Sequence, residues 1–143
     1  MSKTLLGLAI SIASKAFKDR LDAHGEPYIL HCIRVMLKQT NTTRQIIGIL
    51  HDLTEDTDWT IEDLQKKGFG SSILEPLKLL HHDPVIKSYD EYIKEISTND
   101  DARAVKLADL EDNSQITRLK GLTKKDFARM EQYHKAYTYL SKV

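Results

Sequence analysis

Apolar residues recur at intervals of three and four along nearly the whole chain, which is the spacing of one face of an α-helix. The first segment shows this pattern at Leu5, Ala9, Ala13, Ala16 and Phe17. Gly occurs six times and Pro three times in 143 residues, so few positions break a helix. No convincing run alternates apolar and polar residues as a half-buried strand does. The pattern predicts an all-α fold, a bundle of about seven or eight helices.

Start and stop signals divide the chain into the expected helices. Pro27 suits the first turn of a helix, because its fixed φ fits there and its missing N–H costs nothing. Thr60 and Asp63 resemble a capping box that opens a short helix, which Gly68 ends. The other expected helices cover residues 3–19, 27–39, 43–56, 71–81, 89–97, 101–118 and 123–141.

Length and charge restrict the class of protein. A chain of 143 residues has the size of one domain, so residues 1–143 are expected to form a single domain. Lys and Arg together number 21, as do Asp and Glu. A net charge of zero argues against a nucleic-acid binder, which normally carries a basic excess, and gives no support to a polybasic membrane anchor.

The cysteine content and the first residues indicate a cytoplasmic protein. Cys32 is the only cysteine, so no internal disulfide can form and a reducing setting is expected. Leu5–Ala13 could be taken for the apolar part of a signal peptide, but Lys15 and Lys18 follow at once and no A-x-A cleavage site is present. We therefore interpret this segment as the first helix. No run approaches the ~18 apolar residues that a membrane span needs.

The stretch IIGILHDLTEDTDWT, residues 46–60, places four titratable groups directly after five apolar residues. These groups are His51, Asp52, Glu55 and Asp56. His51 follows Ile47 by four residues, so it continues the buried stripe of the helix. Burying such a group without a partner costs several kcal/mol or shifts its protonation. A divalent cation is one partner that would stabilise His51 and Asp52 in the interior.

Two further polar residues lie among expected core positions. His31 shares a helix face with Tyr28 and Val35, and Asp109 lies within an apolar stripe of the segment AVKLADLEDN. Two imidazoles and two carboxylates form a ligand set that suits Mn²⁺, Fe²⁺ or Zn²⁺ better than Ca²⁺. A histidine on an apolar face is, however, more often a hydrogen-bonded core residue than a ligand. The residues alone leave both interpretations open.

The segments PYILH, ILHDLTEDTDWTIEDL and KLADLEDN resemble, in order and spacing, those of the HD-domain phosphohydrolases. The closest resemblance is to the RelA/SpoT-type hydrolase domain and its small stand-alone relatives, which degrade guanosine tetra- and pentaphosphate. The likeness runs from about Gly25 to Tyr133. It implies the HD-domain helical bundle and a Mn²⁺ ion, with Fe²⁺ or Zn²⁺ as alternatives. The family's four metal ligands fall on His31, His51, Asp52 and Asp109.

The resemblance also assigns catalytic residues. The acidic pair that follows the HD dipeptide falls on Glu55 and Asp56, and in the family this pair works beside a Mn²⁺-bound water. Both residues lie one helical turn beyond His51 and Asp52, so we expect them to face the same pocket. A carboxylate there can take the proton of the water or orient it.

Substrate contacts are implied at Asn113, Arg129, Tyr133 and Arg20. Asn113 follows Asp109 by one turn, as the nucleotide-contacting asparagine of the family does. Arg129 and Tyr133 resemble an Arg-xxx-Tyr pair at the substrate, where arginine suits phosphate and tyrosine can flank a base or sugar; plain surface packing is the alternative for this pair. Arg20 lies where the family often has basic residues.

Several positions match the family loosely or not at all. Leu21 and Asp22 stand where more positive charge is expected, and the alignment of Lys87 with a family lysine is uncertain. Cys32 replaces a usual proline, which should alter packing rather than metal binding. The remaining histidines match no ligand position, so we expect structural or solvent-facing roles for His24, His81, His82 and His134.

Three functions are compatible with these features. The first is a Mn²⁺-dependent guanosine 3′,5′-bis(diphosphate) 3′-pyrophosphohydrolase, in which a metal-activated water releases pyrophosphate. The second is an HD-type phosphatase for another small nucleotide, such as a nucleoside monophosphate or an NADPH-like cofactor. The third is a non-catalytic helical module that binds a nucleotide or a protein partner. The sequence leaves the physiological substrate and the oligomeric state open.

Overall fold

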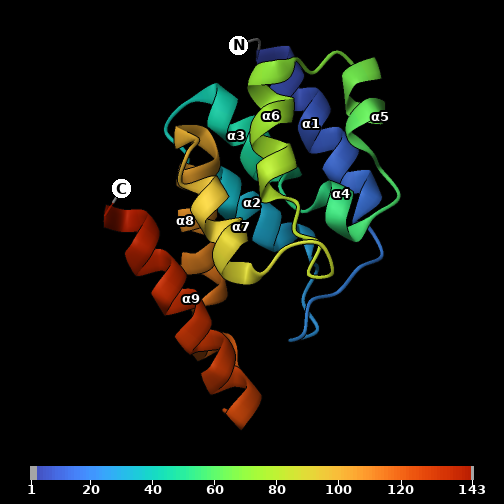
Figure 1. The fold of residues 1–143 in the computed structure, drawn as a ribbon. Coiled ribbons are helices and arrows are strands. Elements are labelled where there is room, and N and C mark those ends of the chain that lie inside the picture. The colour runs from blue at the N-terminus through green and yellow to red at the C-terminus, as the bar shows by residue number, and fades with distance from the viewer. Residues whose placement is uncertain (1–2, 143) are drawn as a thin grey trace.

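The computed structural model describes residues 3–142. Within them the chain forms nine α-helices, one short 3₁₀ helix and no strand, so the all-α prediction is confirmed. The elements, shown in Figure 1, are α1 (Lys3–Ala16), α2 (Ile29–Leu37), α3 (Thr42–Leu50), α4 (Leu53–Asp56), α5 (Ile61–Lys66), α6 (Ser71–Leu80), α7 (Tyr89–Ile96), α8 (Asp100–Asn113), the 3₁₀ helix η1 (Ile116–Arg118) and α9 (Lys124–Lys142).

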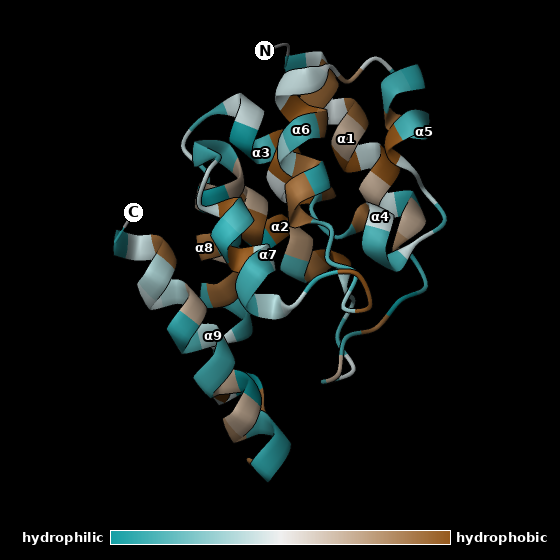
Figure 2. Ribbon diagram, viewed as in Figure 1, coloured by the Kyte–Doolittle hydropathy of each residue, from teal (hydrophilic) through white to brown (hydrophobic). Residues whose placement is uncertain are grey.

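Helix α3 lies at the centre of the bundle and packs against α1, α2, α6 and α8. All residues from Ile46 to Leu50 are buried, so the second half of this helix has no solvent-facing side. A helix that is apolar all round is stable only in the middle of a core. Helix α9 contacts α8 and α7 and extends beyond the body of the bundle, and most of its surface is hydrophilic (Figures 1 and 2).

Gly48 lets α2 and α3 approach closely. A Cβ atom at this position would lie 3.1 Å from Met36 Cα and 3.3 Å from Met36 N, both backbone atoms of the α2 segment. The facing backbone therefore leaves no room for a side chain. Because α2 carries His31 and α3 leads into His51, this contact sets how near the two histidines come to one another.

The helix expected over residues 43–56 is interrupted at His51 and Asp52. Helix α3 ends at Leu50, α4 begins at Leu53, and the two residues between them form a turn. Asp52 has φ −102° and ψ 0°, outside the helical range. In a continuous helix two adjacent side chains point about 100° apart. The turn removes that restriction and brings both side chains to one side of the chain.

The expected helix bounds of residues 27–39 and 101–118 are also corrected. Helix α2 begins only at Ile29, because Pro27 pairs with Leu21 in an isolated antiparallel bridge. Helix α8 ends at Asn113, where Ser114 leaves the helical conformation at φ −93° and ψ 5°. Residues 116–118 then form the separate helix η1.

The capping box at the start of α5 is confirmed. The Thr60 hydroxyl accepts a hydrogen bond from the Asp63 backbone N–H at 3.1 Å, and Asp63 accepts one from the Thr60 N–H at 3.0 Å. Gly68, with φ +103°, follows the end of this helix as expected. Across residues 3–142, every helix is too short or too polar to cross a membrane.

Substitution of Gly48 by Ala is expected to destabilise the protein by about 1–3 kcal/mol, because the added methyl group has to separate α2 from α3. Gly7→Ala is the matched control: Gly7 is also helical, and nothing lies within 4 Å of its added Cβ. The control should stabilise the protein by about 0.5–1 kcal/mol. Urea unfolding of both variants measures the difference. Equal stabilisation by both substitutions would contradict the close helix contact.

Candidate metal centre and substrate pocket

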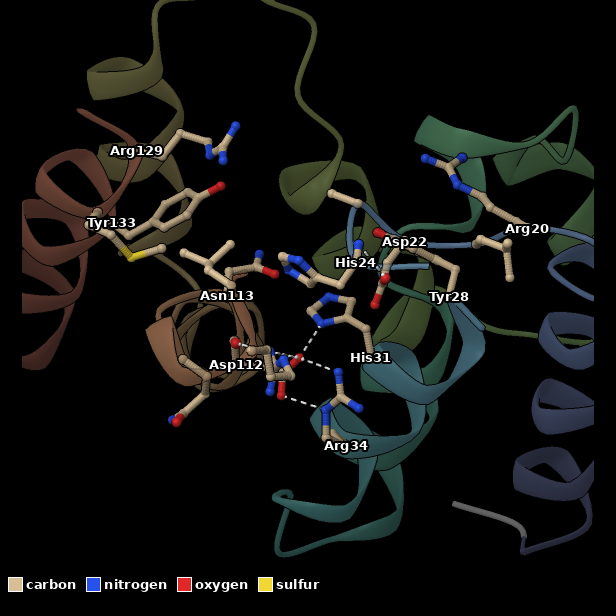
Figure 3. A pocket seen from close by; sticks show the side chains of 16 residues that line it. Arg20, Asp22, His24, Tyr28, His31, Arg34, Asp112, Asn113, Arg129 and Tyr133 are labelled. Carbon is tan, nitrogen blue, oxygen red and sulfur yellow. Dashed lines mark hydrogen bonds and ion pairs between the residues drawn. The ribbon is translucent and has the colours of Figure 1, made fainter. Parts of the chain in front are cut away.

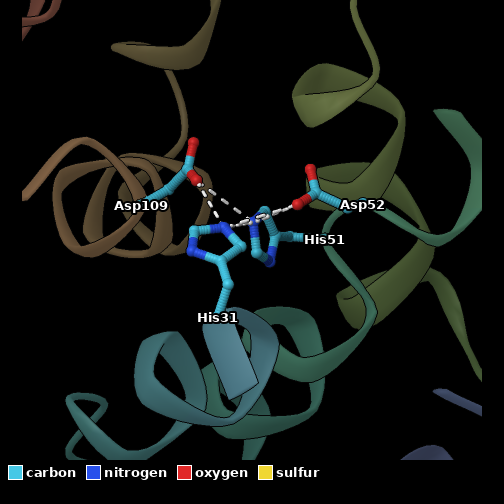
Figure 4. Close-up of side chains that lie close together, drawn as sticks. All are labelled: His31, His51, Asp52 and Asp109. Carbon is cyan, nitrogen blue, oxygen red and sulfur yellow. Dashed lines mark hydrogen bonds and ion pairs between the residues drawn. The ribbon is translucent and has the colours of Figure 1, made fainter. Parts of the chain in front are cut away.

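Four polar side chains from three parts of the chain meet inside the bundle (Figure 4). His31 comes from α2, His51 and Asp52 from the turn between α3 and α4, and Asp109 from α8. Their ligand atoms all lie within 4.8 Å of one another. His31 Nε2 is 3.3 Å from His51 Nε2 and 3.0 Å from Asp109 Oδ1, and His51 Nε2 is 3.0 Å from Asp52 Oδ2. The structure thus brings together the four residues that the sequence singled out as metal ligands.

The outer nitrogen of each histidine ring is held by an acceptor. His51 Nδ1 lies 2.6 Å from the Gly48 carbonyl oxygen, and His31 Nδ1 lies 2.6 Å from Asp112 Oδ2. A carbonyl or carboxylate oxygen can only accept, so each Nδ1 carries a hydrogen. The Nε2 atoms of the two rings then face each other and the carboxylates. Such an arrangement of acceptors needs a positive charge between its members, which either protons or a metal ion can supply.

The two carboxylates are oriented by donors outside the cluster. Tyr28 donates its hydroxyl hydrogen to Asp52 Oδ2 at 2.5 Å. Lys106 Nζ donates to Asp109 Oδ2 at 2.8 Å, and Asn113 Nδ2 donates to Asp109 Oδ1 at 3.1 Å. Each carboxylate therefore has one oxygen facing the histidines and a fixed orientation. Such outer contacts are a regular feature of protein metal sites.

The electric field within the cluster favours positive charge. Burial alone would lower the pKa of His31, but its hydrogen bonds to Asp109, Asp112 and Asp52 outweigh burial and raise the pKa to about 11. For His51 burial is likewise outweighed, by Asp52 and Asp109, and its pKa rises to about 10. Burial would raise the pKa of Asp109, but the charge of Lys106 and both histidines hold it well below the ordinary value.

The donor set fits a divalent transition metal. It offers two imidazole nitrogens and two carboxylate oxygens, which Mn²⁺, Fe²⁺ and Zn²⁺ accept. Neighbouring ligands around one ion, with bonds of about 2.0–2.2 Å, lie roughly 3–3.5 Å apart. The separations from His31 Nε2 to Asp109 Oδ1 and Asp52 Oδ2 are 3.0 and 3.5 Å. The four residues could therefore hold a metal ion.

Glu55 and Asp56, on α4, lie beside the same cluster. Carboxylate oxygens of Asp52, Glu55 and Asp56 come within 4.8 Å of one another. Glu55 accepts a hydrogen bond from the His82 backbone N–H at 2.7 Å, and Asp56 lies 3.6 Å from the Arg20 guanidinium. Burial raises the pKa of both groups, and the charge of Asp52 raises each further. The expectation that this acidic pair faces the site agrees with its position.

Two adjoining cavities open beside the cluster. The larger, of about 560 Å³, lies over Asp52, Glu55, Asp56 and Asp109. The smaller, of about 300 Å³, lies beside His31 and is shown in Figure 3. Four residues line both cavities and mark where they meet: Arg20, Tyr28, Asn113 and Tyr133. The predicted substrate residues Arg20, Asn113 and Tyr133 are thus at the junction, and Arg129 lines the smaller cavity.

Two positions that the sequence left open now have a place. Lys87 lines the larger cavity and forms an ion pair with Glu95. His82 lines the same cavity, but its ring stacks on Tyr92 with 4.5 Å between centroids and its Nε2 lies 2.9 Å from the Lys87 carbonyl oxygen. These contacts suit the structural role expected of His82.

Sequence reasoning missed Asp112 and Lys106. Each lies three residues from Asp109 on α8, so all three side chains share one helix face. Asp112 is 2% exposed, and its carboxylate forms hydrogen bonds with His31 and Arg34 on α2. The signal available in the sequence was this i±3 spacing about Asp109. It becomes informative only when the opposing residue of α2 is known.

Comparison with known proteins supports the RelA/SpoT-type resemblance, although no family model matches the chain. A 68-residue segment is 37% identical to the guanosine-3′,5′-bis(diphosphate) 3′-pyrophosphohydrolase of Haemophilus influenzae. This segment is 45% of the present chain and 10% of that protein, so the chain matches a small part of the curated relative.

A solved structure shares the fold over nearly the whole chain. It is described as a metazoan orthologue of SpoT that hydrolyses ppGpp and plays a role in starvation responses. The TM-score is 0.78, the alignment covers 98% of the present chain and 86% of that chain, and the identity is 21%. The fold expected from the sequence, that of a RelA/SpoT-type hydrolase domain, is therefore confirmed.

Replacing a cluster residue should abolish tight metal binding. We expect His51→Ala and Asp109→Ala proteins to lose high-affinity Mn²⁺ binding in calorimetric titrations, because each removes one of four converging ligand atoms. His134→Ala is the control, since His134 is exposed on α9. Wild-type affinity in either cluster variant would contradict the assignment of ligands.

Metal affinity should rise with pH. The pKa values of His31 and His51 lie near 11 and 10, so below these values a binding ion has to displace their protons. Between pH 6 and 9 we expect binding to release protons and to weaken as the pH falls. Titration calorimetry in buffers of different ionisation enthalpy measures the protons released. An affinity independent of pH would count against imidazole ligands.

Proposed function

We propose that this chain is a metal-dependent hydrolase that removes pyrophosphate from the 3′ position of guanosine 3′,5′-bis(diphosphate). The observation that carries the proposal is the convergence of His31, His51, Asp52 and Asp109 beneath a cavity that also holds an acidic pair. The named activities of the Haemophilus influenzae relative and of the metazoan structure support the choice of substrate. Because only part of the curated relative is matched, its activity is proposed for this chain by analogy.

In this proposal the four residues hold Mn²⁺, with Fe²⁺ or Zn²⁺ as other ions that the same donors accept. When bound, such an ion supplies Lewis acidity and lowers the pKa of water toward neutrality. The residues of the chain keep the imidazole Nε2 lone pairs and one oxygen of each carboxylate directed to a common point. The contacts of Asp112, Gly48, Tyr28 and Lys106 maintain those directions.

Glu55 and Asp56 are proposed to orient the attacking water and to take its proton. Both carboxylates border the larger cavity next to Asp52. Their raised pKa values make them stronger bases than ordinary surface carboxylates. The backbone N–H of His82 fixes the position of Glu55, while Asp56 lies near the Arg20 guanidinium.

The two cavities suit the two ends of a nucleotide. Lys87 and Lys106 line the larger cavity, where their ammonium groups, which also pair with Glu95 and Asp109, are proposed to contact a diphosphate. Leu119, Met130 and Tyr133 line the smaller cavity and offer apolar and aromatic surface to a base or sugar. Asn113 and Arg20, at the junction, are proposed to contact the nucleotide between its ends.

A second candidate is a phosphatase for a less charged nucleotide, such as a nucleoside monophosphate or an NADPH-like cofactor. One observation favours it. Arg34 and Arg118 both pair with Asp112, and Arg129 pairs with Asp126, so each of these three arginines of the smaller cavity already has a carboxylate partner. A nucleotide with phosphates at both ends needs more unpaired cations around it than a less charged nucleotide does. Arginines that are already paired therefore favour the less charged nucleotide.

Other expectations remain predictions. They are the single domain over residues 1–143 and the cytoplasmic setting indicated by one cysteine. The third function, a non-catalytic binding module, would be favoured if purified protein supplemented with Mn²⁺ contained no metal.

We expect wild-type protein with Mn²⁺ to release pyrophosphate, not orthophosphate, from guanosine tetraphosphate in a panel that also contains nucleoside monophosphates and NADPH. Glu55→Gln should lower kcat by about 10²–10⁴-fold through loss of proton transfer, with Mn²⁺ affinity retained. Glu62→Gln, on the exposed surface of α5, is the control. Phosphate and pyrophosphate assays give both readouts.

Two outcomes would contradict the proposal. Full hydrolysis by His51→Ala protein would show that the metal centre is not used. Orthophosphate release from a monophosphate or from NADPH, with guanosine tetraphosphate left intact, would replace the first function by the second.

A further inference from the structure

We propose that Asp112 is a positioning residue of the metal centre, whose carboxylate fixes the ring of His31 so that its Nε2 faces the other ligands. The inference rests on the metal site of the proposed function and adds a residue to it. Asp112 lies outside the four-residue cluster, and Figure 3 shows its carboxylate bonded to the His31 ring and to Arg34.

The hydrogen bond between Asp112 and His31 is short and buried. Asp112 Oδ2 lies 2.6 Å from His31 Nδ1, and the two residues are 2% and 6% exposed. The bond joins α8 to α2, which carry residues 81 positions apart in the sequence. An imidazole held in this way can present only its Nε2 to the cluster. The ring orientation therefore depends on this one carboxylate.

The Asp112 carboxylate is itself held in place by two arginines. Arg34 Nε donates to Oδ1 at 2.7 Å and Arg34 Nη2 donates to Oδ2 at 3.1 Å, a two-point contact that fixes the plane of the carboxylate. Arg118 Nη2 lies 3.3 Å from Oδ2 and also donates to the Asp112 backbone carbonyl. The positive charges of Arg34 and Arg118 offset the cost of burying the anion.

The two histidines of the cluster are supported differently. His51 Nδ1 donates to the carbonyl of Gly48, three residues earlier in α3, so its support comes from nearby backbone. His31 depends on a side chain from another helix, and that side chain carries a full negative charge. A carboxylate in this position makes the imidazole a better electron donor than a carbonyl does. Asp112 is therefore expected to affect metal affinity as well as ring orientation.

A purely structural role is the competing explanation. Through Arg34, Asp112 also joins α2 to α8, and a helix clamp of this kind would stabilise the fold without any effect on the metal. The two roles differ in one measurable respect. A clamp depends on the Arg34–Asp112 ion pair, whereas positioning depends on the Asp112–His31 hydrogen bond.

Mn²⁺ affinity of the folded variants separates these roles. We expect Asp112→Ala to raise the Kd for Mn²⁺ about 10–100-fold. Asp112→Asn should have a smaller effect, because its amide oxygen still accepts from His31 Nδ1 but carries no charge. Asp101→Asn is the matched control: Asp101 is also on α8 and pairs with Arg44 at 2.8 Å, about three turns from Asp112. The control should bind Mn²⁺ as wild type does.

Arg34→Met tests the clamp directly, since it breaks the ion pair and leaves the bond to His31. We expect it to lower the thermal stability of the metal-free protein. We expect it to raise the Kd for Mn²⁺ less than Asp112→Ala does. A loss of affinity in Arg34→Met equal to that in Asp112→Ala would overturn the inference, as would wild-type affinity in Asp112→Ala. If Asp112→Ala does not fold, unchanged affinity in Asp112→Asn overturns it.

The same titrations distinguish failure of this inference from failure of the proposed function. Wild-type protein that binds Mn²⁺ but hydrolyses no nucleotide contradicts only the proposed activity, and the variant affinities still decide the role of Asp112. Wild-type protein that binds no Mn²⁺ overturns both.

Discussion

Two imidazole nitrogens and two carboxylate oxygens face one another in the interior of this protein, and most of the surrounding structure serves to keep them there. Acceptors held 3.0–3.5 Å apart repel unless positive charge lies among them. The fold nevertheless holds the four groups through the packing of α2, α3 and α8. Protons on the histidines supply this charge in the protein alone and a metal ion can take their place, which is why we regard this cluster as functional.

The same constraint explains the contacts around the cluster. Each of its members is held by a contact outside the cluster: His51 by the Gly48 carbonyl, His31 by Asp112, Asp52 by Tyr28 and Asp109 by Lys106. Asp112 in turn forms ion pairs with Arg34 and Arg118, and both arginines line the smaller cavity. The contacts that hold the centre therefore include residues of that cavity. The charges that orient the centre and those that line the smaller cavity are therefore coupled.

The sequence predicted much of the site because its signals are local. His51, Asp52, Glu55 and Asp56 lie within six residues of one another, and His31 and Asp109 occupy apolar stripes whose period marks them as inward-facing. The helix break at His51 and Asp52 could not be predicted, since both residues continue the helical pattern on either side. In the folded protein the break lies where these two adjacent side chains meet His31 of α2 and Asp109 of α8.

The sequence by itself thus determined the helical architecture, the capping of α5 and the identity of the residues able to bind a metal, because periodicity, capping and side-chain chemistry depend on near neighbours. Only the tertiary structure decided that α2 packs closely against α3 at Gly48, and that Asp112 rather than solvent binds the outer nitrogen of His31. It also decided that Arg34, Arg118 and Arg129 are paired with carboxylates. These features depend on contacts between residues far apart in the chain, and no local pattern specifies which of them meet.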